Sequence, residues 1–250
     1  MTSTMRRKAG VGYLPIEDHG VIGNLCTAAL VGTDGTIDWL CLPAFDSPSV
    51  FAAILDDEKG GRFKIAPAVE GVAPKQLYWP DTNVLVTRFF APDGVAEITD
   101  YMPVGAPANG QGRHQLVRRV RVVRGEMAFR MECSPAFNYA RDGHKTEITK
   151  GGACFHSEPL SLGLATDVPL RSESNGAVSE FSLREDQTAL FVLREIESGA
   201  DCGLSLQAGG RRAFYADRRV LAPVALEVNL HGPLARDGSP LSSDAQAPDL

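Results

Sequence analysis

Apolar residues along this chain gather in short runs that are rich in Val, Ile, Phe and Thr, and Gly, Pro, Asn or Asp separates one run from the next. Long patterns with helical spacing are missing, which argues against strands that alternate with helices in a parallel sheet. The pattern is typical of an all-β fold, and we expect a large antiparallel β-sandwich (supersandwich). The predicted strands lie near residues 27–31, 36–42, 62–66, 83–91, 94–100, 115–124, 126–134, 145–149, 153–157, 160–166, 176–183 and 188–196.

Tight turns join several of these predicted strands. Asp34-Gly35 supplies the positive-φ positions that a hairpin turn needs, and Pro92-Asp93-Gly94 does the same further along the chain. We expect another link of this kind at Arg124-Gly125. Most neighbouring strands are therefore predicted to pair directly and antiparallel.

The segment from residue 36 to residue 55 combines a strand with the helix that the sequence predicts. Strict alternation in the strand would put Asp38 and Trp39 on opposite faces. Pro43 ends the strand, and Asp46 or Ser47 before Pro48 has the pattern of a helix cap and first helical position. We therefore expect a short helix over residues 48–55.

The charge balance argues against some classes of partner. The formal net charge is −6 and the pI is near 5.4, whereas binding to nucleic acid or to an anionic membrane needs clustered Lys and Arg. One dense basic run exists, and its alternation with valines predicts the solvent-facing side of a strand; it comprises Arg118, Arg119, Arg121 and Arg124. We expect neither nucleic acid nor a membrane as partner.

The cysteines and the N-terminus bear on the compartment. The five cysteines are odd in number and contain no C-x-x-C pair, so neither a disulfide framework nor a zinc ribbon is predicted. The apolar stretch after Arg6 and Arg7 is too short for a signal peptide. A cytoplasmic protein is the expectation, and no cofactor or metal is predicted.

Several blocks of this sequence are similar to the opening of bacterial glycoside hydrolase family 15 proteins, which are glucoamylase-like and trehalase-like enzymes. The blocks are Tyr13-Leu-Pro-Ile-Glu-Asp-His-Gly-Val-Ile-Gly23, Thr27-Ala-Ala-Leu-Val-Gly32, Gly35-Thr-Ile-Asp-Trp-Leu-Cys-Leu-Pro43, Phe45-Asp-Ser-Pro48, Leu116-Val-Arg-Arg-Val120, Pro135-Ala-Phe-Asn-Tyr-Ala-Arg141 and Phe191-Val-Leu-Arg194. The resemblance covers roughly residues 13–220. It implies the N-terminal β-sandwich domain of that family, which precedes a catalytic (α/α)6 barrel and needs no organic cofactor.

The resemblance implies a supporting role for this chain. In the family, the catalytic acid and base are glutamates of the barrel, and no residue here matches their motifs, so we assign no catalytic residue. We expect the sandwich to pack on the barrel, absent from this sequence, and to shape its pocket for an α-glucoside. Four residues are candidates for facing the barrel or the substrate: Asp38, Trp39, Phe45 and Asp46.

Two positions depart from the family pattern, and other interpretations stay open. Ala44 stands where the family commonly has Arg, and Asn138 stands where it commonly has Asp, so a charge-assisted contact is lost at each. Asp38 and Asp46 could instead be turn or cap residues, and Trp39 could be core packing. The chain could also be a free-standing carbohydrate-binding module that uses Trp39 with Trp79 or Tyr139, or an inactive truncated product.

The two ends of the chain differ from its middle. We expect residues 1–12 to be flexible, 13–220 to form the sandwich domain and 221–250 to be disordered, because the last segment is rich in Pro, Ser, Asp and Gly. A reading frame shifted by one nucleotide over 231–250 can encode a run that resembles the helix entering the family's barrel. The tail is therefore a candidate frameshift product, which the underlying nucleotide sequence would test.

Overall fold

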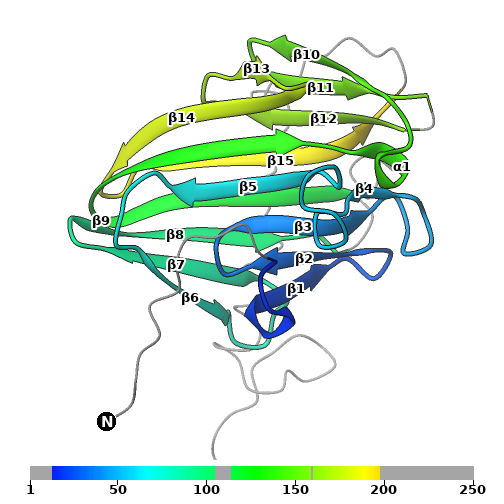
Figure 1. Ribbon diagram of the computed structural model, residues 1–250. Coiled ribbons are helices and arrows are strands. Elements are labelled where there is room, and N and C mark those ends of the chain that lie inside the picture. Colours follow the sequence, from blue (N-terminus) through cyan, green and yellow to red (C-terminus); the bar gives the residue numbers. More distant parts are fainter. Residues whose placement is uncertain (1–12, 105–113, 159, 198–250) are drawn as a thin grey trace, which may run out of the picture.

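The computed structural model describes residues 13–104, 114–158 and 160–197. Fifteen strands in these ranges form an antiparallel β-sandwich, which confirms the predicted all-β fold (Figure 1). The segments 1–12 and 221–250, and with them the frameshift hypothesis, lie outside the described residues.

The strands make up two layers. One layer contains β1 (His19–Gly23), β2 (Ala28–Gly32), β3 (Thr36–Cys41), β4 (Ser49–Phe51), β5 (Arg62–Pro67), β13 (Arg171–Glu173) and β14 (Gly176–Arg184). The other contains β6 (Ala73–Tyr78), β7 (Leu85–Ala91), β8 (Gly94–Tyr101), β10 (Lys145–Thr149), β11 (Gly152–His156), β12 (Ser161–Thr166) and β15 (Thr188–Ile196).

Strand β9 (Gln115–Ser134) belongs to both layers. Its first half pairs with β8 and β15, and its second half pairs with β5 and β14. The hairpin predicted at Arg124-Gly125 is wrong, because the chain continues there as one bent strand. Gly125 makes the bend possible: its φ is +77°, and a Cβ atom would lie 2.1 Å from the Asp93 carbonyl oxygen.

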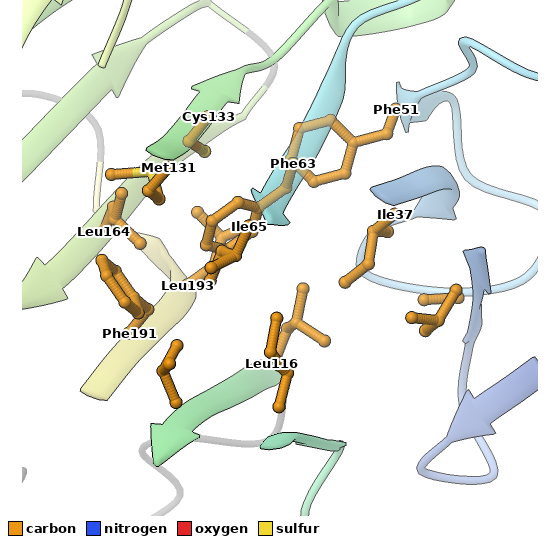
Figure 2. Close-up of a cluster of buried hydrophobic side chains, with 14 of the residues drawn as sticks. Ile37, Phe51, Phe63, Ile65, Leu116, Met131, Cys133, Leu164, Phe191 and Leu193 are labelled. Atoms are coloured by element: carbon orange, nitrogen blue, oxygen red, sulfur yellow. The ribbon is translucent and has the colours of Figure 1, made fainter. Parts of the chain in front are cut away.

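The core lies between the layers and takes side chains from both (Figure 2). Ile37, Phe63 and Ile65 come from one layer, and Phe191 and Leu193 come from the other; all five are fully buried. The rings of Phe63 and Phe191 meet edge to face, with centroids 6.4 Å apart. Burial of each such side chain contributes about 1.5–3 kcal/mol, so this interface dominates the stability of the fold.

A buried arginine also joins the two layers. Arg118 was expected on a solvent-facing side, but it is fully buried and its Nε donates to Asp100 Oδ1 at 2.8 Å. Its Nη1 and Nη2 donate to the carbonyl oxygens of Phe63 and Gly35, at 2.5 Å and 2.8 Å. These partners satisfy the guanidinium group, which lets a charge occupy the core.

The helix predicted over residues 48–55 is wrong. Ser49–Phe51 forms strand β4, whose three residues are buried and which pairs with β3, Phe51 lying opposite Leu40. Pairing and burial override the local cap pattern here. Strands β1, β6 and β13 also lie outside the predicted set.

The two ends of the sandwich carry different connections. Antiparallel pairing places residues 33–35, 68–72, 92–93, 150–151, 167–170 and 185–187 at one end, with the Gly125 bend; we call this the turn end. The opposite end, at the right of Figure 1, carries 24–27, 42–48, 52–61, 79–84, 102–104, 135–144, 157–158, 160 and 174–175; we call this the loop end.

Candidate functional site

Asp38 sits at an irregularity in β3. Leu30 of β2 pairs with Trp39 and Val31 pairs with Ile37, so Asp38 has no partner in β2 and forms a β-bulge. The bulge breaks the strict alternation that the sequence predicted, since Ile37 and Leu40 both enter the core although they are three residues apart.

The side chain of Asp38 is held by His19 of β1. His19 Nε2 lies 2.8 Å from Asp38 Oδ2, and His19 Nδ1 lies 3.0 Å from the carbonyl oxygen of Pro15. A carbonyl oxygen only accepts, so Nδ1 donates to Pro15, and a neutral ring has no second N–H for Asp38. The pair therefore shares one extra proton, carried by the ring or by the carboxyl group.

Burial and charge shift both pKa values of this pair. Burial by itself lowers the pKa of His19, but the hydrogen bond and the charge of Asp38 outweigh burial and leave it raised. Burial raises the pKa of Asp38 in spite of the opposing hydrogen bond with His19. Asp38 is 8% exposed and its Oδ1 has no hydrogen-bond partner among the described residues.

Trp39, the second candidate, faces a different neighbour. Its ring is half-buried and lies 6.3 Å from the ring of Tyr139, with the planes tilted by 51°. Tyr139 belongs to the 135–144 connection and is 41% exposed. The structure thus brings Trp39 together with a loop-end aromatic residue, while Asp38 is held by the β1 histidine.

Phe45 and Asp46 lie in the 42–48 connection of the loop end, and both are exposed. Phe45 donates its backbone N–H to Cys26 of the neighbouring 24–27 connection at 3.0 Å, and its side chain is 63% exposed. The turn is closed by Ser47, whose N–H donates to Ala44 and whose hydroxyl accepts from the Ala44 N–H. Phe45 therefore projects from a hydrogen-bonded turn.

The short element α1 (Phe137–Ala140) is a left-handed turn. Asn138 has φ 52° and ψ 51°, Tyr139 has φ 57° and ψ 43°, and Ala140 has φ 61°. Each such residue other than Gly costs roughly 1–2 kcal/mol, and Asn tolerates the conformation best. Buried Phe137 and the hydrogen bond from the Tyr139 N–H to Ser49 Oγ, at 3.2 Å, hold the turn in place.

Sequence reasoning missed this turn as a functional feature. Tyr139 was named only as an alternative aromatic platform, because Phe-Asn-Tyr-Ala carries no Gly to signal three left-handed residues. The Asn at position 138 was the one available signal, since Asn is enriched in this conformation. Strain of this kind persists where the surrounding structure enforces it, often at binding sites.

Some kinds of chemistry find no support among the described residues. No group of three or more His, Cys, Asp and Glu side chains there is placed to hold a metal ion. No helix within the described ranges has the length and apolar character that a membrane span requires. What the loop end offers is a set of exposed aromatic and aliphatic side chains on a rigid sandwich.

Comparisons with known proteins agree with the resemblance seen in the sequence. Residues 5–199 match the family described as trehalase-like, N-terminal. A trehalase of Thermoplasma volcanium is 37% identical over 166 residues, which is 66% of this chain and 26% of that protein. A trehalase of Mycobacterium tuberculosis is 32% identical over 203 residues, which is 72% of this chain and 30% of that protein.

A third relative and one solved structure extend the comparison. Trehalase 1 of Sulfolobus acidocaldarius is 42% identical over 159 residues, 62% of this chain and 26% of that protein. A solved structure, a putative kojibiose phosphorylase from the human microbiome, aligns with a TM-score of 0.42 and 8% identity over 83% of this chain and 34% of its own. This chain thus spans less than a third of the length of these curated relatives.

Proposed function

Because this chain belongs to the trehalase-like N-terminal family, we propose that it is the non-catalytic accessory domain of an α-glucoside hydrolase of glycoside hydrolase family 15, of trehalase or glucoamylase type. In this proposal the sandwich packs on a catalytic (α/α)6 barrel through its loop end and shapes the barrel's pocket. Asp38, Trp39, Phe45 and Asp46 remain the proposed barrel-facing or substrate-facing residues, and we propose a cytoplasmic location.

The uneven distribution of exposed apolar side chains carries this proposal. Six large hydrophobic residues are exposed in loop-end connections, namely Leu25 (84%), Phe45 (63%), Leu55 (63%), Val104 (49%), Tyr139 (41%) and Trp79 (40%). Among the described turn-end connections only Val69 is such a residue, and Ile16 (66%) lies beside that end in the 3-10 turn Ile16–Asp18 before β1. An apolar surface gathered at one end of a rigid domain is typical of a protein interface, whereas scattered exposed residues are ordinary.

An accessory role also fits the chemistry of the described residues. Inverting hydrolysis of a glycosidic bond needs two carboxyl groups about 6.5–9.5 Å apart, one protonated and one ionised, facing the same bond. Asp38, whose pKa is raised, is buried against His19 instead. Asp100 is fully buried against Arg118. Neither of these two carboxyl groups is placed to act as the acid or the base of such a pair, and we expect the catalytic pair on the partner domain.

The proposal is tested by assembling the two parts from separate chains. The full 250-residue chain is mixed with the Thermoplasma volcanium trehalase shortened to remove the segment that this chain matches. We expect a one-to-one complex in light scattering after size exclusion, and trehalose hydrolysis that the shortened trehalase lacks or shows only weakly. Trehalose hydrolysis by the 250-residue chain alone would contradict the proposal.

A matched pair of variants locates the interface. Phe45→Asp places a charge at the loop end, and Phe90→Asp places one on β7 near the turn end, where Phe90 is 41% exposed. We expect Phe45→Asp to weaken the complex at least about tenfold, the effect of one lost apolar anchor, and Phe90→Asp to leave it unchanged. The reverse result would place the interface elsewhere.

A further inference from the structure

An open hollow lies beside the left-handed turn α1 at the loop end. Its volume is about 660 Å³, within the usual range for small-ligand sites. Arg141, Asp142 and Gly143, which directly follow α1, line one side, and Ser157 and Glu158, which follow β11, line the other. Two connections, one before the β10–β11 hairpin and one after it, therefore build the hollow together.

The strained turn fixes the position of the groups at the rim. Tyr139 and Ala140 keep left-handed conformations although neither is Gly, and the Arg141 guanidinium lies over the Tyr139 ring, 5.8 Å from its centroid. Tyr139 packs on Trp39, and its backbone N–H donates a hydrogen bond to Ser49 Oγ. Arg141 thus projects from a turn that the sandwich holds in one conformation.

The polar groups of the hollow are available for a ligand. Within the described ranges, no ion pair or hydrogen bond engages the side chains of Arg141, Asp142 and Glu158, and the Arg141 guanidinium group lies over the tyrosine ring. Ser157 donates its hydroxyl hydrogen to the Gly143 carbonyl oxygen at 3.0 Å, which leaves its oxygen free to accept. The hollow therefore presents acceptors from two carboxylates and a hydroxyl, and donors from one guanidinium group.

This set of groups selects a class of ligand. Two carboxylates disfavour an anion, the guanidinium group disfavours a cation, and all three charged groups would lose water without replacement beside an apolar molecule. A neutral molecule with several hydroxyl groups satisfies all of them, because each hydroxyl both donates and accepts. The Tyr139 ring lies beside the Arg141 guanidinium group and supports that side chain from outside the hollow.

We propose that this hollow is a binding site for a neutral sugar, with Arg141, Asp142 and Glu158 as its hydrogen-bonding residues and with the Tyr139 ring supporting Arg141. The proposal is independent of docking to a catalytic domain, since it assigns a ligand to this chain by itself. Sugar binding can therefore fail while complex formation succeeds, and the reverse holds as well.

The test is a titration of the full 250-residue chain with trehalose and, separately, with maltose. We expect saturable changes in the backbone amide resonances of residues 141–143 and 157–158, with a dissociation constant on the order of 1 mM for at least one of the two sugars. Trp fluorescence should change with the same midpoint, because Trp39 touches Tyr139.

Variants separate this site from binding elsewhere. We expect Arg141→Ala and the double variant Asp142→Asn/Glu158→Gln each to weaken sugar binding about tenfold or more, since each removes a charged hydrogen-bonding partner. Asp186→Asn, at the exposed turn end, should bind as the unmodified chain does. Tyr139→Asn keeps a residue that tolerates the left-handed conformation and removes the ring, so weaker binding there reports on the ring itself.

Three outcomes would overturn the proposal. The first is the absence of saturable resonance changes with either sugar. The second is binding that Arg141→Ala and the double variant leave unchanged. The third is saturation of the same resonances by inorganic phosphate in place of the sugars, which would show that the guanidinium group dominates the hollow.

Discussion

The two ends of the sandwich differ in which residues adopt backbone conformations with positive φ. At the turn end, most positions with positive φ are glycines, namely Gly35, Gly71, Gly125 and Gly152, with Asp186 as the exception among the described residues. At the loop end, most are residues with side chains, namely Leu25, Asp81, Asn138, Tyr139, Ala140, Ser174 and Asn175, and Gly61 is the glycine. The turn end is therefore relaxed, whereas the loop end holds strain.

The difference suggests which end the protein uses. A glycine gives a tight turn at little steric cost, so the turn end serves the fold. Holding Tyr139 in a left-handed conformation costs free energy, but it presents an aromatic ring where glycine would present none. The same end carries most of the exposed apolar side chains in connections, which supports the assignment of docking and sugar binding to it.

The largest expected effect concerns Arg118, which braces the turn end by donating to Gly35. Arg118→Leu leaves the Asp100 carboxylate buried without its partner, so we expect the free energy of unfolding to fall by about 3–5 kcal/mol. Urea denaturation followed by circular dichroism measures it. The double variant Arg118→Leu/Asp100→Leu should recover part of the loss, and a double variant as unstable as the single one would contradict this account.

The next effect tests whether the turn end needs its glycines. Gly35 has φ +81°, and a Cβ atom would lie 2.0 Å from the Ile65 carbonyl oxygen. We expect Gly35→Ala to lower the free energy of unfolding by at least about 2 kcal/mol. Gly143→Ala is the control, because a Cβ there meets nothing within 4 Å. Equal losses in both variants would remove the steric explanation.

A smaller effect, of opposite sign, tests the strain at the loop end. Ala140 is exposed and has φ 61°, so Ala140→Gly should raise the free energy of unfolding by about 0.5–1 kcal/mol. Ala73→Gly, at an exposed position in β6, should instead lower it by a similar amount. If Ala140→Gly also destabilises the protein, the turn is not strained.

The smallest effect concerns the His19–Asp38 pair, which ties β1 to β3. The pKa of His19 is raised, since Asp38 outweighs burial, so its contribution to stability is fully present below its ordinary pKa of 6.5 and is lost as pH rises through the folded value. Asp34 also faces the pair; its pKa is lowered because Lys64 and nearby hydrogen bonds outweigh burial, so it stays ionised in this range.

Urea midpoints measured between about pH 6 and pH 9 test this contribution, because that interval brackets the His19 titration. The unmodified chain should lose stability with rising pH relative to His19→Gln, which keeps hydrogen-bonding groups but does not titrate there. Parallel pH profiles for the two proteins would show that the pair shares no proton.

Much of the fold was predictable because the signals were local. Asp34-Gly35 and Pro92-Asp93-Gly94 predicted turns that the structure contains, and the alternating valines of 115–124 predicted a strand. The candidate site was predictable only in part. Phe45 and Asp46 lie at the loop end. The partner of Asp38 is His19, and the partner of Trp39 is Tyr139, which follows Trp39 by a hundred residues in the sequence.

By itself the sequence determined the class of fold, because strand periodicity and turn residues act over a few neighbours, and its motifs indicated the family. Tertiary structure decided what depends on distant partners. Tertiary contacts let β9 continue through Gly125 and pair in both layers. They also place Ser49–Phe51 in a strand beside β3 and bury Arg118 against Asp100. Packing also decided that Tyr139 adopts a left-handed turn, since only contacts such as that with Ser49 offset its cost.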